Sequence, residues 1–202
     1  MCFSVTKSIP VPKSLQNIHK CLVKSKIIAE RPTHGELVNW AKQGVLLLNR
    51  YLTRSPDIRK NDKNEIWVEG NGNSEKRFLH EFWSGFTTIL IKYLTTEFIA
   101  QTGKISLNHD RHYISVMLWG NIAKELQSVV GPSTKACKVE VMTWMHPVCI
   151  SIAEASEAHF INCDHFINTN QGLSKCDRAE INWDPDYEPT SNLFSQFHMS
   201  DL

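Results

Sequence analysis

The stretch that decides the fold is Gly44-Val-Leu-Leu-Leu-Asn49, a continuous apolar run bounded by a glycine and an asparagine. A short run without alternation is typical of a strand buried on both faces, as in a parallel sheet. Two later runs, Ile114–Trp119 and Val139–Met145, have the same character. Helical periodicity predicts helices at 14–27, 35–42, 74–97, 122–130 and 164–175. Strands that alternate with helices predict an α/β fold, a three-layer α/β/α sandwich with a short, mostly parallel central sheet.

The chain is large enough for one domain, because its 202 residues are 42% hydrophobic. The formal charge of +1 conceals an asymmetry: residues 154–202 carry a net charge of −7, so residues 1–153 carry +8. We expect a domain over residues 1–183 and an acidic, disordered tail over residues 184–202. A polyanion would therefore meet the first part of the chain rather than the tail.

Six cysteines are scattered through the sequence without a CxxC pair. We interpret them as reduced thiols of an intracellular protein, because a chain of this size does not need disulfides to stabilise its core. The N-terminus lacks the apolar stretch of a signal peptide, and the sequence contains no apolar run long enough to span a membrane. We therefore expect no membrane association.

Candidate site residues follow the three expected strands. In an open parallel sheet, ligands bind beyond the carboxyl ends of the strands. These ends carry Asn49, Gly120 with Asn121, and His146 with Pro147. A carboxamide offers an acceptor and donors in one plane, as the amide edge of a base requires. An imidazole can donate to an oxygen that gains negative charge, ligate a metal or transfer a proton. Each residue alone could simply end a strand, but their occurrence at matching ends favours a ligand site.

Other chemistries lack the necessary residues. His159, Cys163 and His165 lie close together, but their spacing matches no common zinc pattern, so we expect no metal site. The sequence contains no Walker loop, GxGxxG motif or nucleophile elbow. The basic residues between Arg50 and Lys63 are interpreted as part of a solvated loop rather than as a phosphate-binding track.

Seven segments resemble the family-1 uracil-DNA glycosylases, in the order in which that family has them. The most specific is Trp40–Asn49, which matches the family segment WAKQGVLLLN at ten consecutive residues. The others resemble the end of GLCFSV, the proline-rich serine loop, LLWGS, HPSPLS, CRHFSKTN and IDW; they are Met1–Val5, Pro10–Ser14, Leu118–Asn121, His146–Ser151, Asp164–Asn170 and Ile181–Trp183. The resemblance spans residues 1–183, with an enlarged loop after Leu52.

This resemblance implies a hydrolase of base-excision repair that acts without a metal or another cofactor. Such an enzyme flips uracil out of single- or double-stranded DNA and hydrolyses its N-glycosidic bond. Phe3 would stack on the uracil, Asn49 would bind its amide edge, and His146 would be the catalytic donor to its oxygen. The residues that would hold the DNA, with Ile150 as the wedge in the vacated stack, are Ser14, Gly120, Asn121, Pro147, Ile150 and Ser151.

The sequence departs from the family pattern at several positions. Asn121 and Val148 replace serines, and Ile150 replaces the wedge leucine. The family segment GQDPYH, whose aspartate orients the attacking water and whose tyrosine excludes thymine, lies upstream of GLCFSV. We therefore expect an N-terminally truncated version of the fold, with little or no uracil release from these 202 residues alone. Either the sequence starts at an internal methionine of a longer enzyme, or it is a degenerate relative in which a protein partner covers the gap.

Two alternatives to an active glycosylase stay open. The first is a non-catalytic relative that acts as a DNA- or replication-protein-binding module; it would bind DNA without releasing uracil. The second is an α/β domain of unrelated function, which is rejected if Asn49 and His146 face one pocket. The family resemblance also favours a nuclear location, in the host nucleus if the source is viral.

Overall fold

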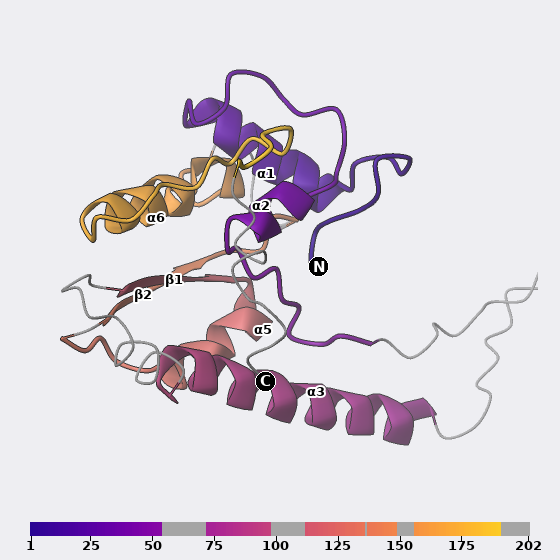
Figure 1. Ribbon diagram of the computed structural model, residues 1–202. Helices are drawn as coiled ribbons and strands as arrows, with labels where there is room; N and C mark the ends of the chain where they lie inside the picture. The colour runs from indigo at the N-terminus through magenta and orange to yellow at the C-terminus, as the bar shows by residue number, and fades with distance from the viewer. Residues whose placement is uncertain (54–71, 98–111, 136, 149–155, 191–202) are drawn as a thin grey trace, which may run out of the picture.

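The computed structural model describes residues 1–53, 72–97, 112–135, 137–148 and 156–190. Helices dominate it, and Figure 1 shows their order along the chain. The elements are α1 (Lys13–Lys24), α2 (Val38–Lys42), α3 (Gly72–Thr95), β1 (His112–Trp119), α5 (Asn121–Lys124), the 3-10 helix η1 (Glu125–Ser128), β2 (Cys137–Trp144), the 3-10 helix η2 (Phe160–Asn162) and α6 (His165–Ser174).

The strands β1 and β2 pair in parallel, in a register that runs from His112 opposite Cys137 to Trp119 opposite Trp144. Both are rich in β-branched and aromatic residues, which favour a pleated, half-buried surface. These are the second and third strands expected from the sequence, and both are confirmed. Because the strands are parallel and in register, they end at the same edge of the sheet. The turns that follow them therefore start side by side.

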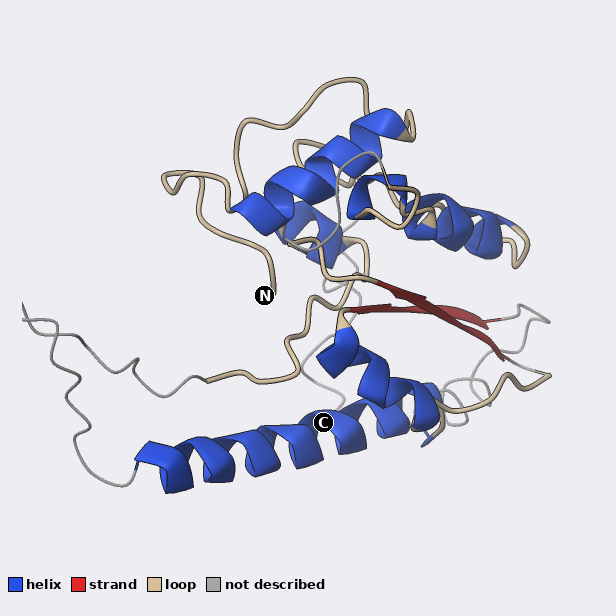
Figure 2. Ribbon diagram, turned by 180° about the vertical axis from the view of Figure 1, so that it is seen from behind, coloured by secondary structure: helices blue, strands red, loops and turns tan. Residues whose placement is uncertain are grey.

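Helices cover both faces of the sheet. Figures 1 and 2 show α1, α2 and α6 on one face, and α3 with α5 on the other. This arrangement confirms the predicted three-layer α/β/α architecture. The main core lies on the side of α1, α2 and α6, where the buried apolar side chains include Leu15, Ile18, Leu22, Trp40, Phe160, Phe166 and Trp183. Burial of these large side chains is the main stabilising contribution in this half of the molecule.

The prediction of a strand at Gly44–Asn49 is wrong. Within the described residues this segment belongs to no sheet, Gly44 has a φ of 94°, and the Leu46 side chain is 59% exposed. One backbone hydrogen bond, from the Cys2 N–H to the Leu47 carbonyl at 3.0 Å, attaches it to the N-terminal segment. An apolar run indicates a buried strand only where neighbouring strands pair with it, and sequence periodicity does not report the neighbours.

The sequence favours Ser14 as the N-cap of the first helix, but α1 begins two residues earlier than that cap implies. Its N-cap is Pro12, so Ser14 lies within the first turn rather than at the cap. A proline suits the start of a helix, because the missing N–H would have no partner there. The helix expected at 122–130 is observed as α5 followed by η1.

The packed part of the domain extends past Trp183, where we expected the disordered tail to begin. Pro185 is fully buried, and its carbonyl accepts a hydrogen bond from the Asn39 side chain at 3.0 Å. The Asp186 carboxylate lies 2.9 Å from Nε2 of His34. These contacts place residues 184–186 in the domain, while residues 191–202 lie outside the described part.

Candidate active site

The site starts where β1 and β2 end. The Gly120 N–H donates to the Trp144 carbonyl at 3.0 Å, and Gly120 has a φ of 88°. A Cβ atom at this position would lie 3.1 Å from Cβ of His146. A glycine is therefore required both by the backbone conformation and by the close approach of the two turns. Two of the expected strand ends, Gly120 and His146, are in contact.

The ring of His146 is oriented by its own turn. Its Nδ1 accepts a hydrogen bond from the Val148 N–H at 3.1 Å, and the side chain is exposed. A neutral imidazole with an accepting Nδ1 carries its proton on Nε2, which is thereby a donor. The following Pro147 is fully buried, and its carbonyl accepts from the Asn17 side chain at 2.7 Å. The turn that carries His146 is thus fastened to α1.

Phe3 completes an aromatic group at this edge. Its ring centroid lies 5.9 Å from that of His146 and 5.7 Å from that of Trp119. Phe3 has a φ of 61°, a strained conformation for a bulky side chain that tends to persist at functional sites. Trp119 is itself fixed, because its Nε1 donates to Nδ1 of His165 at 3.0 Å. Burial lowers the pKa of His165 and so keeps this acceptor neutral.

Asn49 lies at the end of the segment that Cys2 holds. The Leu47 carbonyl accepts a hydrogen bond from the Cys2 N–H. Leu47 lies two residues before Asn49, and Cys2 lies immediately before Phe3. This bond connects the Asn49 segment to the N-terminal segment that carries Phe3, and the Asn49 side chain is exposed. The residues thus brought together directly are Phe3, Gly120 and His146, and Asn49 is linked to them through Leu47 and Cys2.

The expected DNA-binding residues have different surroundings. Ser14 is half-buried in the first turn of α1, where backbone N–H groups lack helical partners and suit an anion. Asn121 is exposed as the first residue of α5. Ile150 and Ser151 lie outside the described residues. Within the described part of the chain, no group of three or more His, Cys, Asp or Glu side chains could hold a metal, and no helix is long and apolar enough to cross a membrane.

Sequence reasoning missed two residues at this edge. Trp119, which contacts Phe3, could have been found, because it immediately precedes Gly120 within the segment that resembles LLWGS. Arg50 was interpreted as part of a solvated loop, and that interpretation is wrong: its side chain is only 9% exposed and bonds to α3. No sequence pattern distinguishes this arginine from the basic residues that follow it in the sequence.

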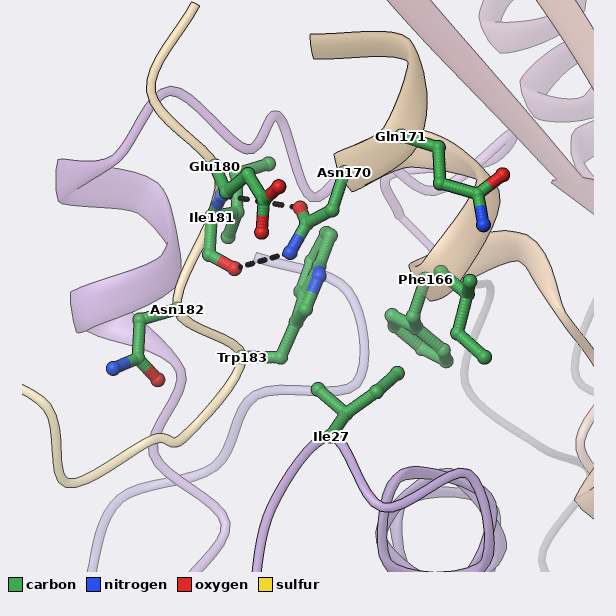
Figure 3. Close-up of a pocket in the computed structure, with 9 residues that line it drawn as sticks. Ile27, Phe166, Asn170, Gln171, Glu180, Ile181, Asn182 and Trp183 are labelled. Carbon is green, nitrogen blue, oxygen red and sulfur yellow. Dashed lines mark hydrogen bonds between the residues drawn. The ribbon is translucent and has the colours of Figure 1, made fainter. Parts of the chain in front are cut away.

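A separate pocket of about 480 Å³ lies between α6 and the segment 180–183 (Figure 3). Within it, the Asn170 side chain donates to the Ile181 carbonyl at 2.9 Å and accepts from the Ile181 N–H at 3.1 Å. The lining residues are Ile27, Phe166, Ile167, Asn170, Gln171, Glu180, Ile181, Asn182 and Trp183. None of the expected site residues is among them, so this pocket is distinct from the candidate site.

The sandwich and the site together define an α/β protein with an aromatic and imidazole site at the carboxyl edge of a parallel sheet. No protein-family model matches the chain. It is 33% identical over 183 residues to the uracil-DNA glycosylase of Dichelobacter nodosus, an alignment that covers 91% of this chain and 63% of that protein. The human uracil-DNA glycosylase is 30% identical over 183 residues, 91% of this chain and 47% of that protein.

Solved structures agree with these sequence relatives. The crystal structure of mimivirus uracil-DNA glycosylase matches with a TM-score of 0.64 and 26% identity, over 91% of this chain and 59% of that chain. A variant of the same enzyme in complex with UGI matches with a TM-score of 0.63 and 27% identity. The chain belongs to the uracil-DNA glycosylase family, and it spans less than two thirds of the length of these relatives.

Proposed function

We propose that the protein excises uracil from DNA. The observation that carries this proposal is the hydrogen bond from the Val148 N–H to Nδ1 of His146. It leaves the proton of a neutral His146 on Nε2, which is exposed at the carboxyl edge of the sheet beside Phe3. A donor held in place before the reaction is the arrangement that stabilises a developing oxyanion most effectively.

The roles proposed for these side chains depend on where negative charge develops during the reaction. When the bond between C1′ of the sugar and N1 of uracil breaks, its electron pair moves into the base, and negative charge grows on the uracil oxygen. The Nε2–H of His146 donates to that oxygen, a contribution of about 3 kcal/mol by comparison with oxyanion-hole donors. Water adds to C1′, and the base leaves as uracil once it has gained a proton.

Binding the flipped base must offset the cost of unstacking it, which is a few kcal/mol. Stacking on the ring of Phe3 contributes about 1–3 kcal/mol. The Asn49 carboxamide, paired with the amide edge of uracil, contributes about another 1–3 kcal/mol. Ser14 and the Gly120 backbone would hold phosphates on either side of the extruded nucleotide. The two base contacts together are sufficient to retain an extruded uracil.

The test compares two oligonucleotides that differ in one base, uracil or thymine. We expect the protein to bind the uracil strand more tightly, as measured by fluorescence anisotropy. Asn49→Ala should abolish this preference, and His146→Ala should keep it. When the segment with the water-orienting aspartate is also present, His146→Ala should slow uracil release by about 10²–10³-fold. Equal affinity of the wild type for both strands would refute the proposal. Preferential binding without release, even when the segment with the water-orienting aspartate is present, would instead favour the non-catalytic module.

We also infer that a polypeptide covers an exposed apolar stripe of α3. The apolar side chains there are 44–71% exposed and recur at helical spacing; they are Phe78, Phe82, Phe86 and Ile89. An exposed contiguous stripe of this kind marks a protein-binding surface more often than a free one. This observation supports the expectation of a protein partner, and its consequence for the isolated chain is tested below.

A further inference from the structure

The Arg50 side chain turns back onto α3 instead of extending into solvent. One terminal nitrogen shares its two N–H groups among three acceptors, the Ser84 carbonyl at 2.8 Å, the Thr87 hydroxyl at 2.6 Å and the Thr88 hydroxyl at 2.8 Å. The other donates to the Ser84 hydroxyl at 2.8 Å. All four bonds reach a single turn of the helix. The guanidinium is therefore held in one place and orientation.

The backbone of residue 50 is attached to the same turn. The fully buried Thr87 hydroxyl donates to the Trp83 carbonyl at 2.7 Å and lies 3.3 Å from the Arg50 carbonyl. Further along the segment, the Thr53 hydroxyl accepts from the Trp83 indole N–H at 2.6 Å. Residues 50–53 therefore run along α3 as a fastened strap, and the strap begins immediately after Asn49.

The segment that leads to Asn49 belongs to no sheet in the described structure, although Val45 and Leu47 pack against the core. The N–H groups of Gly44 and Val45 bond to carbonyls of α2, and the recorded backbone bond nearest to Asn49 on this side is the one at Leu47. A side chain that must recognise a base needs supporting contacts that keep it within a fraction of an ångström of its working position. Leu47 anchors the chain on one side of Asn49, and residue 50 supplies the supporting contacts on the other side.

The burial of the Arg50 guanidinium does not by itself stabilise the fold. Its nearest carboxylate, that of Glu125, is exposed and lies 4.0 Å away, and its Nε is buried without a hydrogen-bond partner in the described structure. Removing a guanidinium from water without a close counter-charge does not favour folding by itself. A requirement for position, rather than for stability, accounts for this arrangement.

We propose that Arg50 is a positioning residue for uracil recognition, which clamps the chain to α3 so that the Asn49 carboxamide meets the amide edge of the base. This proposal rests on the proposed function. Lysine would keep the positive charge but cannot reproduce the fork of four hydrogen bonds, because its ammonium is a single point donor. Arg50→Lys is therefore the informative variant.

The experiment measures the affinity of the 202-residue protein for three oligonucleotides, which carry uracil, thymine or a base-free tetrahydrofuran at one position. We expect Arg50→Lys to weaken binding of the uracil strand about tenfold, the equivalent of one well-placed hydrogen bond, and to leave binding of the base-free strand unchanged. The matched control is Arg31→Lys, at an exposed arginine, which should change neither affinity.

A double-variant cycle separates positioning from general damage. If Arg50 acts through Asn49, adding Arg50→Lys to Asn49→Ala should cause no further loss of uracil binding. Equal losses for the uracil and base-free strands, or a full further loss in the Asn49→Ala background, would overturn the proposal. Failure of the proposed function looks different, because the wild type would then bind the uracil and thymine strands equally.

Discussion

At the scale of single residues, Gly120 is the position where the two strand ends constrain each other most. Its φ of 88° is unfavourable for any residue with a Cβ, and the added atom of Gly120→Ala would lie 3.1 Å from Cβ of His146. We expect this variant to lower the free energy of unfolding by about 1–2 kcal/mol, as measured by urea denaturation. Ile122→Ala, at an exposed side chain of the next turn, is the control. A Gly120→Ala protein as stable as the wild type would contradict the assigned backbone geometry.

His19 makes the stability of the protein depend on pH. Burial, with smaller effects of Arg31 and His34, lowers its pKa from 6.5 to about 4. Between these values the unfolded chain binds a proton that the folded chain does not. The stabilisation is therefore complete above about pH 6.5 and decreases as the pH falls towards 4, by about 2 kcal/mol at pH 5. Urea denaturation at pH 7.5 and pH 5 measures this loss.

The control for this titration is His19→Gln, which cannot gain a proton. We expect the variant to lose less stability than the wild type between pH 7.5 and pH 5. A part of the loss should remain, because burial also lowers the pKa of His165, and that residue acts in the same direction. Identical pH dependence in variant and wild type would show that His19 is not the responsible group.

The sequence was informative about which side chains form the site and less so about how they are held. The strand ends and the family motifs pointed to His146 and Gly120, which are in contact, and the resemblance added Phe3, which touches His146. The positive φ of Phe3 and the buried fork of Arg50 were not predicted. Both depend on contacts between segments far apart in the chain, to which local sequence patterns are insensitive.

At the scale of elements, the contact between α6 and β1 depends on a glycine, Gly172, which has no side chain. A Cβ at Gly172 would lie 2.1 Å from the ring of Tyr113. The ring cannot easily move away, because its hydroxyl donates to the Glu140 carboxylate at 2.5 Å. We expect Gly172→Ala to destabilise the protein by about 1–3 kcal/mol in thermal or urea unfolding, as overpacking does.

Gly85→Ala is the matched control for this contact. A Cβ there would meet nothing within 4 Å, so the same substitution in α3 should raise stability by up to about 1 kcal/mol through helix propensity. If Gly172→Ala is no less stable than Gly85→Ala, then α6 does not pack on β1 through this glycine.

The elements also show where sequence periodicity is reliable. The runs of β1 and β2 were recognised because each strand pairs with the other in full register, so local pattern and long-range pairing agree. The run Gly44–Asn49 has the same pattern and forms no ladder in the described structure. Its apolar character is plain from the sequence, but its pairing was not predictable, because pairing is a property of the neighbours.

At the scale of the whole molecule, the two helical layers are unequal. The layer of α1, α2 and α6 encloses the main core, whereas α3 leaves a row of apolar side chains exposed, with Phe82 51% and Ile89 71% exposed. The amphipathic pattern of this helix was visible in the sequence. Which part of the stripe would be covered depends on what packs against the helix, and the sequence does not encode that locally.

This uncovered stripe predicts the behaviour of the isolated 202-residue chain. We expect the chain to associate at micromolar concentration in sedimentation velocity experiments and to bind the dye ANS, because exposed apolar surface drives association. The double variant Phe82→Ser and Ile89→Ser should sediment more nearly as a monomer and bind less dye. Ile9→Ser, which removes a half-exposed apolar side chain outside the stripe, should change neither property. If wild type and double variant are equally monomeric and bind equally little dye, the apolar stripe of α3 is not a contact surface, and the inferred polypeptide partner has no site on this helix.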